Sequence, residues 1–231
     1  MRRLINRVRL AFLLSLGSVG LACAQSKSVF AEKMLVTQGK NNAETALFMA
    51  KSFLGAPYVA HTLENTPEAL VCNLQTFECY TFVESVLALT LTRKASGNYE
   101  QYQDFLQKLR YRNGIITGYG SRLHYFLEWK QQAGAQGWVT DVSAALGGTE
   151  VRPTIHFMTS HRALYPALKD DNAAAEIQKA EKQLSTLPWY FIPKNKVEAI
   201  ENKLRDGDII GITSGTVSYT HLRAHETIAL I

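Results

Sequence analysis

The residue of this sequence best suited to chemistry is Cys79, which opens a strongly apolar stretch that runs to Thr92. If this stretch is helical, the thiol lies at its first turn, where unpaired backbone N–H groups and the helix dipole stabilise a thiolate. A lowered pKa makes a cysteine thiol a nucleophile near neutral pH. Cysteine is also common as a small apolar core residue. The position therefore predicts either a reactive thiol or a structural one.

A thiol nucleophile also needs a base, and imidazole suits this role because its pKa lies near neutral pH. His124 and His161 are the candidates in the body of the chain, whereas His61 and His156 have no supporting context. Arg122 stands two residues before His124, and we interpret this pair as shaping a cleft that binds acyl or carboxylate groups. A buried histidine bonded to the backbone is the alternative for His124. For His161 we prefer a cap or loop hydrogen bond.

The elements that must position these residues are mostly helical. Apolar residues at three- and four-residue steps predict helices at 42–54, 79–92, 99–110, 122–132, 173–187 and 196–204. Ser121 is the expected cap of the helix at 122–132. Strands are expected at 151–158 and 209–212. Helices that precede a late, small sheet indicate an α+β protein with one domain.

Residues 1–24 have the organisation of a secretory signal peptide. Four arginines precede an apolar segment at 10–21, and the cleavage sequence Ala22-Cys23-Ala24 follows. The apolar segment is shorter than the roughly 20 residues that span a membrane. We therefore expect an exported protein of the periplasm or cell envelope, without stable membrane insertion after cleavage. A lipoprotein anchored through Cys23, or an uncleaved anchor, is the alternative.

The stretch from Val217 to Thr227 resembles translated sequencing adapter of the transposase-library type. We therefore expect the native domain to occupy residues 25–216 and to be incomplete at its C-terminal end, with 217–231 as a non-native tail. No function is placed on His221 or His225. A natural strand with two histidines is the alternative interpretation of this stretch.

The charge balance gives no sign of a nucleic-acid partner. The chain has 25 Lys+Arg against 20 Asp+Glu, and without the four arginines of the signal peptide 21 remain against 20. A nucleic-acid-binding domain would carry a clear basic surface.

Neither a metal nor another cofactor is expected. The chain has no His-Glu-x-x-His motif and no closely spaced Cys/His pairs, whereas zinc requires three or four ligands. Outside the signal peptide the cysteines are Cys72 and Cys79, which could form a disulfide in an oxidising compartment. One structural and one reactive thiol is the other interpretation.

Several motifs resemble one family of envelope proteins. They run in order along the chain: Leu54-Gly55-Ala56-Pro57-Tyr58, Phe77-Glu78-Cys79-Tyr80-Thr81-Phe82-Val83-Glu84, Arg110-Tyr111-Arg112-Asn113-Gly114, Ser121-Arg122-Leu123-His124-Tyr125-Phe126, Phe157-Met158-Thr159-Ser160-His161 and Asp206-Gly207-Asp208-Ile209-Ile210. Together they resemble the N-acetylmuramoyl-L-alanine amidase-like family, within the papain-like (NlpC-type) cysteine cell-wall hydrolases.

This resemblance implies a papain-like fold, in which the helix of the nucleophile Cys79 packs on a small antiparallel sheet that is mostly missing here. The family has Asp before the nucleophile, where this chain has Glu78, so a positioning role for this carboxylate is open. Its catalytic histidine follows the Gly-Asp-Ile-Ile segment. The residues expected to bind substrate or line the cleft are Tyr58, Glu78, Arg122, His124 and Tyr125.

The function implied is hydrolysis of an amide bond in peptidoglycan or muropeptides through a thiol nucleophile. A module that binds peptidoglycan stem peptides without cutting them is the alternative. The printed chain is expected to be inactive, because the histidine base and the strands that close the sheet would follow Thr216.

Overall fold

The computed structural model describes residues 25–212. The predicted signal peptide, with Cys23, and the stretch Val217–Thr227 lie outside these residues. Across residues 25–212, no helix combines the length and the apolar character that crossing a membrane requires.

The N-terminal part consists of packed helices. A helix at 25–33 is followed by α2 (Asn42–Lys51), α3 (Cys79–Lys94) and α4 (Tyr99–Arg110). Asn side chains cap two of them: Asn41 accepts from the Glu44 N–H at 2.8 Å, and Asn98 accepts from the Gln101 N–H at 3.0 Å. The predicted helices at 42–54, 79–92 and 99–110 are confirmed, although α2 ends three residues early.

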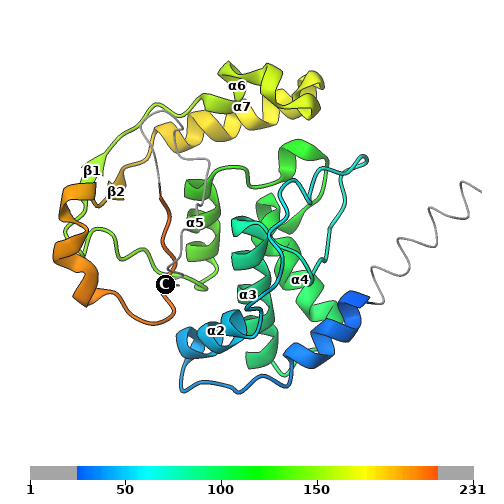
Figure 1. Cartoon of the computed structure of the whole chain (residues 1–231). Coiled ribbons are helices and arrows are strands. Elements are labelled where there is room, and N and C mark those ends of the chain that lie inside the picture. Colours follow the sequence, from blue (N-terminus) through cyan, green and yellow to red (C-terminus); the bar gives the residue numbers. More distant parts are fainter. Residues whose placement is uncertain (1–24, 213–231) are drawn as a thin grey trace, which may run out of the picture.

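Helix α3 lies in the middle of this part and packs against α2 and α4 (Figure 1). Val86, Ala88 and Leu89 have exposed fractions of 0%. Because neighbours cover α3 on several faces, its apolar residues surround the helix instead of forming the narrow stripe of a surface helix. The first core cluster is built around it, and distant Ile209 also joins this cluster.

The C-terminal part holds α5 (Phe126–Ala135), α6 (Phe157–Ser160), α7 (Asp171–Ser185) and two short strands. Strand β1 (Thr149–Val151) pairs antiparallel with β2 (Trp189–Phe191), with Thr149 opposite Phe191. Figure 1 shows this sheet on the side of α5 remote from α3. Short 3-10 helices complete the part: Arg112–Gly114, Tyr119–Ser121, Arg162–Leu164, Pro166–Lys169, Lys194–Lys196 and Glu198–Lys203. The expected α+β class is confirmed.

The helix predicted at 122–132 is α5, which begins four residues later than predicted and ends three residues later. Its first residues are extended, because Leu123 donates to the Arg110 carbonyl at 2.9 Å and Arg122 bridges Tyr111. Ser121 does not cap α5: its hydroxyl donates to the Gly118 carbonyl at 2.7 Å. A tertiary pairing thus overrides the local helical pattern at this point.

Three other predicted elements also differ from the structure. The strand predicted at 151–158 is wrong, since β1 ends at Val151 and α6 begins at Phe157. The helix predicted at 196–204 is formed by 3-10 turns. Within the described residues, the segment predicted as a strand at 209–212 forms only a single bridge, at Ile209.

Candidate active site

Cys79 is the first residue of α3 and is half-buried. The preceding residue, Glu78, is the N-cap, with an extended backbone at φ −105° and ψ 175°. Its N–H donates to Thr81 Oγ1 at 3.0 Å, which fixes the entry of the chain into the helix. Cys72 and Cys79 are both thiols, so the structure does not adopt the disulfide alternative. The thiol therefore stands where helix dipole and backbone N–H groups favour its ionised form.

A second segment pairs with the chain just before Cys79. Phe77 donates to the Pro57 carbonyl at 3.1 Å and accepts from the Val59 N–H at 2.9 Å, which forms a parallel bridge between Tyr58 and Phe77. Tyr58 has an exposed fraction of 71%. The segment Gly55-Ala56-Pro57-Tyr58 is thus held next to the start of α3, and its tyrosine side chain is exposed.

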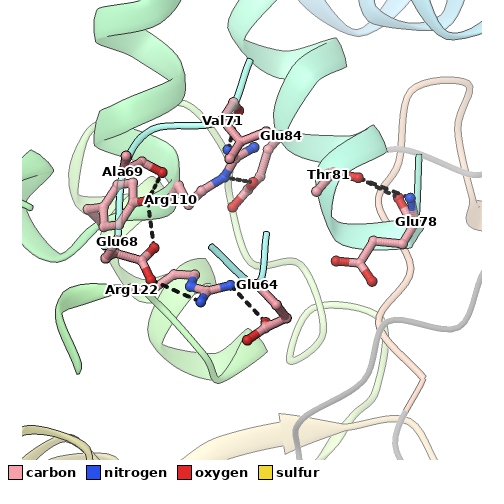
Figure 2. A network of polar contacts seen from close by, with 10 residues as sticks. Glu64, Glu68, Ala69, Val71, Glu78, Thr81, Glu84, Arg110 and Arg122 are labelled. Carbon is pink, nitrogen blue, oxygen red and sulfur yellow. Dashed lines mark hydrogen bonds and ion pairs between the residues drawn. The ribbon is translucent and has the colours of Figure 1, made fainter. Parts of the chain in front are cut away.

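The guanidinium of Arg122 is engaged with the loop 64–71 (Figure 2). Its side chain has an exposed fraction of 7% and contacts Glu64 at 3.2 Å and Glu68 at 3.1 Å. It also lies 4.8 Å from the centre of the Tyr119 ring. Because two carboxylates already neutralise this cation, it offers no free fork to a substrate carboxylate. Its contacts instead position the loop.

Two further residues hold the same loop. The Tyr111 hydroxyl donates to Glu68 at 2.8 Å and lies 3.1 Å from the Ala69 carbonyl. Arg110 donates to the Val71 carbonyl at 2.6 Å and pairs with Glu84 of α3 at 2.8 Å (Figure 2). The loop between Tyr58 and Cys79 is therefore anchored both to α3 and to the end of α4.

The pair of Arg110 and Glu84 is buried, with side-chain exposed fractions of 2% and 3%. Burial alone would lower the pKa of Arg110, but the adjacent Glu84 carboxylate more than offsets this effect, so that its pKa is raised. The guanidinium therefore stays charged, and the buried ion pair links α4 to α3.

His124 is held in its neutral form. Burial, with the nearby Arg122 charge, lowers its pKa from 6.5 to about 3. Its Nε2 lies 2.8 Å from the Tyr119 carbonyl. A carbonyl only accepts hydrogen bonds, so Nε2 carries the proton and Nδ1 keeps the lone pair. A pKa this far below neutrality makes His124 unsuited to accept the proton of a thiol, and the alternative of a histidine bonded to the backbone describes it.

We expect the burial of His124 to make stability depend on pH. The unfolded chain takes up a proton near pH 6.5, whereas the folded chain takes it up only near pH 3, so stability falls as pH decreases through this window. Between pH 6.5 and 5 the loss would be about 2 kcal/mol. Urea unfolding at both pH values measures it. The variant His124→Gln should lose less over this interval, and an equal loss would contradict the assignment.

Tyr125 lies inside the second core cluster, with an exposed fraction of 0%. Its hydroxyl donates to Glu181 at 2.6 Å and accepts from the Met158 N–H at 3.0 Å. Because the side chain is buried, a substrate does not reach this hydroxyl, and Tyr125 does not line a cleft as we expected. Its tertiary partner Glu181 lies 56 residues away within α7, and no local spacing in the sequence links the two.

The other histidines with ring hydrogen bonds are bound to their own chain segments. Nδ1 of His161 lies 2.9 Å from the Phe157 carbonyl, as the cap or loop interpretation implies. Nδ1 of His156 lies 3.3 Å from the Thr154 carbonyl. Over residues 25–212, no three His, Cys, Asp or Glu side chains gather in a way that could hold a metal ion.

These features define a mixed α+β protein with a thiol at the capped start of its central helix. Residues 48–223 match the profile of the AmiA-like family, described as N-acetylmuramoyl-L-alanine amidase-like, and the chain belongs to this family. The match includes residues at the beginning of the Val217–Thr227 stretch, whose origin stays a prediction. Among curated proteins, none matches the chain.

Several solved structures are similar to this chain. An N-acetylmuramoyl-L-alanine amidase from Bacteroides uniformis is 40% identical with a TM-score of 0.72, over 78% of this chain and 77% of that chain. A Bacteroides fragilis protein described as a candidate xylanase is 37% identical with a TM-score of 0.60, over 64% of this chain and 65% of that chain. A Legionella pneumophila protein, 16% identical with a TM-score of 0.60 over 81% of this chain and 72% of that chain, shares the fold.

Proposed function

We propose that this protein hydrolyses an amide bond of peptidoglycan or muropeptides with Cys79 as nucleophile. The supporting observation is the position of this half-buried thiol at the capped start of α3, beside the exposed Tyr58. Membership of an amidase-like family supports the class of substrate.

In the proposed reaction the Cys79 thiolate attacks the amide carbonyl, and a sulfur–carbon bond forms. The carbon–nitrogen bond then breaks, and the amine leaves with a proton from the base. Water hydrolyses the thioester, releasing a carboxylate and restoring the thiol. Backbone N–H groups at the start of α3 stabilise the negative charge that develops on the carbonyl oxygen.

We propose that the base lies outside the described residues. His124 is neutral and bound to the Tyr119 carbonyl, and His156 and His161 are bound to carbonyls of their own segments. The family resemblance implies a catalytic histidine after Gly207-Asp208-Ile209-Ile210, on strands that would complete a papain-like sheet. We further propose that native residues of the gene follow Thr216 in the full-length protein, and activity is to be measured on that protein.

The xylanase description of the Bacteroides fragilis relative suggests a different bond. Hydrolysis of a glycosidic bond normally uses two carboxyl groups on either side of it. In the loop 64–71, Glu64 and Glu68 both bind Arg122, and Glu68 also accepts from Tyr111. Because both carboxylates are engaged in these structural contacts, we favour amide hydrolysis by the thiol over glycoside hydrolysis by two carboxyl groups.

A module that binds stem peptides without cutting them is the competing function, and Glu78 supports it because the family has Asp there. Selective alkylation separates the two. Cys79 should react with iodoacetamide at pH 7 at least about 10-fold faster than Cys72, which is also half-buried. Peptide mapping by mass spectrometry measures both rates, and a Cys79 that reacts no faster than Cys72 would favour the binding module.

A further inference from the structure

The parallel bridge beside Cys79 also places a histidine that has no role so far. Val59 and Phe77 are hydrogen-bonded at 2.9 Å, and the two segments run in the same direction. Cys79 follows Phe77 by two residues, and His61 follows Tyr58, the bridge partner of Phe77, by three residues. Two residues of chain span at most about 7 Å and three at most about 10 Å. His61 and Cys79 therefore both follow the bridge at the same end, each within about 10 Å of it along the chain.

The backbone of His61 is left-handed, with φ 60°. This conformation is disfavoured for residues other than glycine, although histidine is among the residues that adopt it more often. A turn follows, in which the Glu64 N–H donates to the His61 carbonyl at 3.4 Å, and Arg122 holds Glu64. The same anchored loop that begins at Tyr58 thus presents an exposed imidazole.

The hydrogen bonds of the histidines single out His61. The rings of His124, His156 and His161 are each bound to a backbone carbonyl. The ring of His61, in contrast, makes no hydrogen bond within residues 25–212. An exposed imidazole that follows the bridge at the same end as Cys79 can bind a ligand through either ring nitrogen.

We propose that His61 is a substrate-binding residue, which donates a hydrogen bond to an acceptor oxygen of the stem peptide next to the scissile amide. This inference rests on the proposed function for its class of substrate. The chain distances from the bridge, two residues to Cys79 and three to His61, match a peptide that extends one or two residues from the bond at Cys79. The acceptor is either a carboxylate or a peptide carbonyl of this segment.

The test measures binding rather than turnover. The full-length Cys79→Ala protein is titrated calorimetrically with two probes, N-acetylmuramoyl-L-alanyl-D-glutamate and its D-isoglutamine counterpart, in which a carboxamide replaces the α-carboxylate. His61→Gly is added in this background, and it removes the imidazole while relieving the left-handed backbone. His61→Asn keeps an N–H donor and tolerates the same backbone.

Ser96→Gly is the matched control. Ser96 is also exposed and left-handed, at φ 52°, but it follows the last turn of α3. The 16 residues of α3 put it about 24 Å from Cys79. Its substitution relieves the same kind of backbone conformation at the far end of the helix.

We expect His61→Gly to raise Kd about 10-fold, His61→Asn to raise it less, and Ser96→Gly to leave it unchanged. A larger loss for the carboxylate probe assigns the bonded oxygen to the carboxylate, and equal losses assign it to a carbonyl common to both probes. Unchanged affinity in both His61 variants, or equal losses in His61→Gly and His61→Asn, would overturn the inference.

The failure of the proposed function has a separate signature. Amine release that persists in Cys79→Ala would reject the nucleophile, while the binding differences among the His61 variants would stand. A parent protein that binds neither probe would reject both the substrate class and the role of His61.

Discussion

Replacement of Cys79 by alanine in the full-length protein should lower kcat/KM for amine release from N-acetylmuramoyl-L-alanyl peptides by at least about 1,000-fold. Loss of a covalent nucleophile removes the acyl-enzyme route altogether, and residual rates then come from binding and backbone N–H groups alone. Product analysis by liquid chromatography and mass spectrometry measures the release.

Two controls separate a loss of the nucleophile from a loss of folding. Cys72→Ala should retain activity, because this thiol lies before α3 and contacts Gln103 at 3.8 Å. Unfolding of Cys79→Ala in urea should resemble that of the parent, which would show that the loss is chemical. Turnover in Cys79→Ala within a few-fold of the parent would exclude Cys79 as the nucleophile.

The second large effect concerns the buried pair of Arg110 and Glu84. Arg110→Met leaves the Glu84 carboxylate buried without its cation and removes the hydrogen bond to the Val71 carbonyl. Loss of one partner of a buried ion pair costs about 3–5 kcal/mol. We expect a decrease of this size in the free energy of unfolding, measured by circular dichroism in urea.

The same helix supplies the matched control. Lys108 pairs with Asp104 at 2.7 Å on the surface of α4, with side-chain exposed fractions of 45% and 54%. Lys108→Met should change the stability by less than about 0.5 kcal/mol. The double variant Arg110→Met with Glu84→Leu should recover part of the loss, because no charge is then left buried. Equal decreases in the free energy of unfolding for Arg110→Met and Lys108→Met would contradict a stabilising role of the buried ion pair.

The helices were predicted well wherever the interactions that form them are local. Asn98 and the apolar spacing of Tyr102, Leu106 and Leu109 lie within one segment, and α4 has the predicted bounds. The prediction at 122–132 was displaced because the pairing of Arg122 with Tyr111 competes with the helical pattern. No spacing within the segment reveals such a partner.

In the candidate site, too, features that depend on local sequence could be predicted, and features that depend on tertiary contacts could not. The position of Cys79 at a helix start could be predicted, because the apolar stretch that it opens is continuous in sequence. The neutral state of His124 could not, since it depends on burial and on the charge of Arg122. The engagement of Arg122 could not either, because its partner Glu64 lies 58 residues away.

By itself, the sequence determined the helical periods, the thiol at the start of α3 and the motifs that indicate the family. Only the tertiary structure decided that Arg122 is occupied, that Tyr125 is buried and that the segment of Tyr58 pairs with the chain just before the thiol. The physical reason is the range of the interactions. Helix periodicity acts over three or four residues, whereas ion pairing, burial and the bridge between Tyr58 and Phe77 depend on segments that meet only in the folded chain.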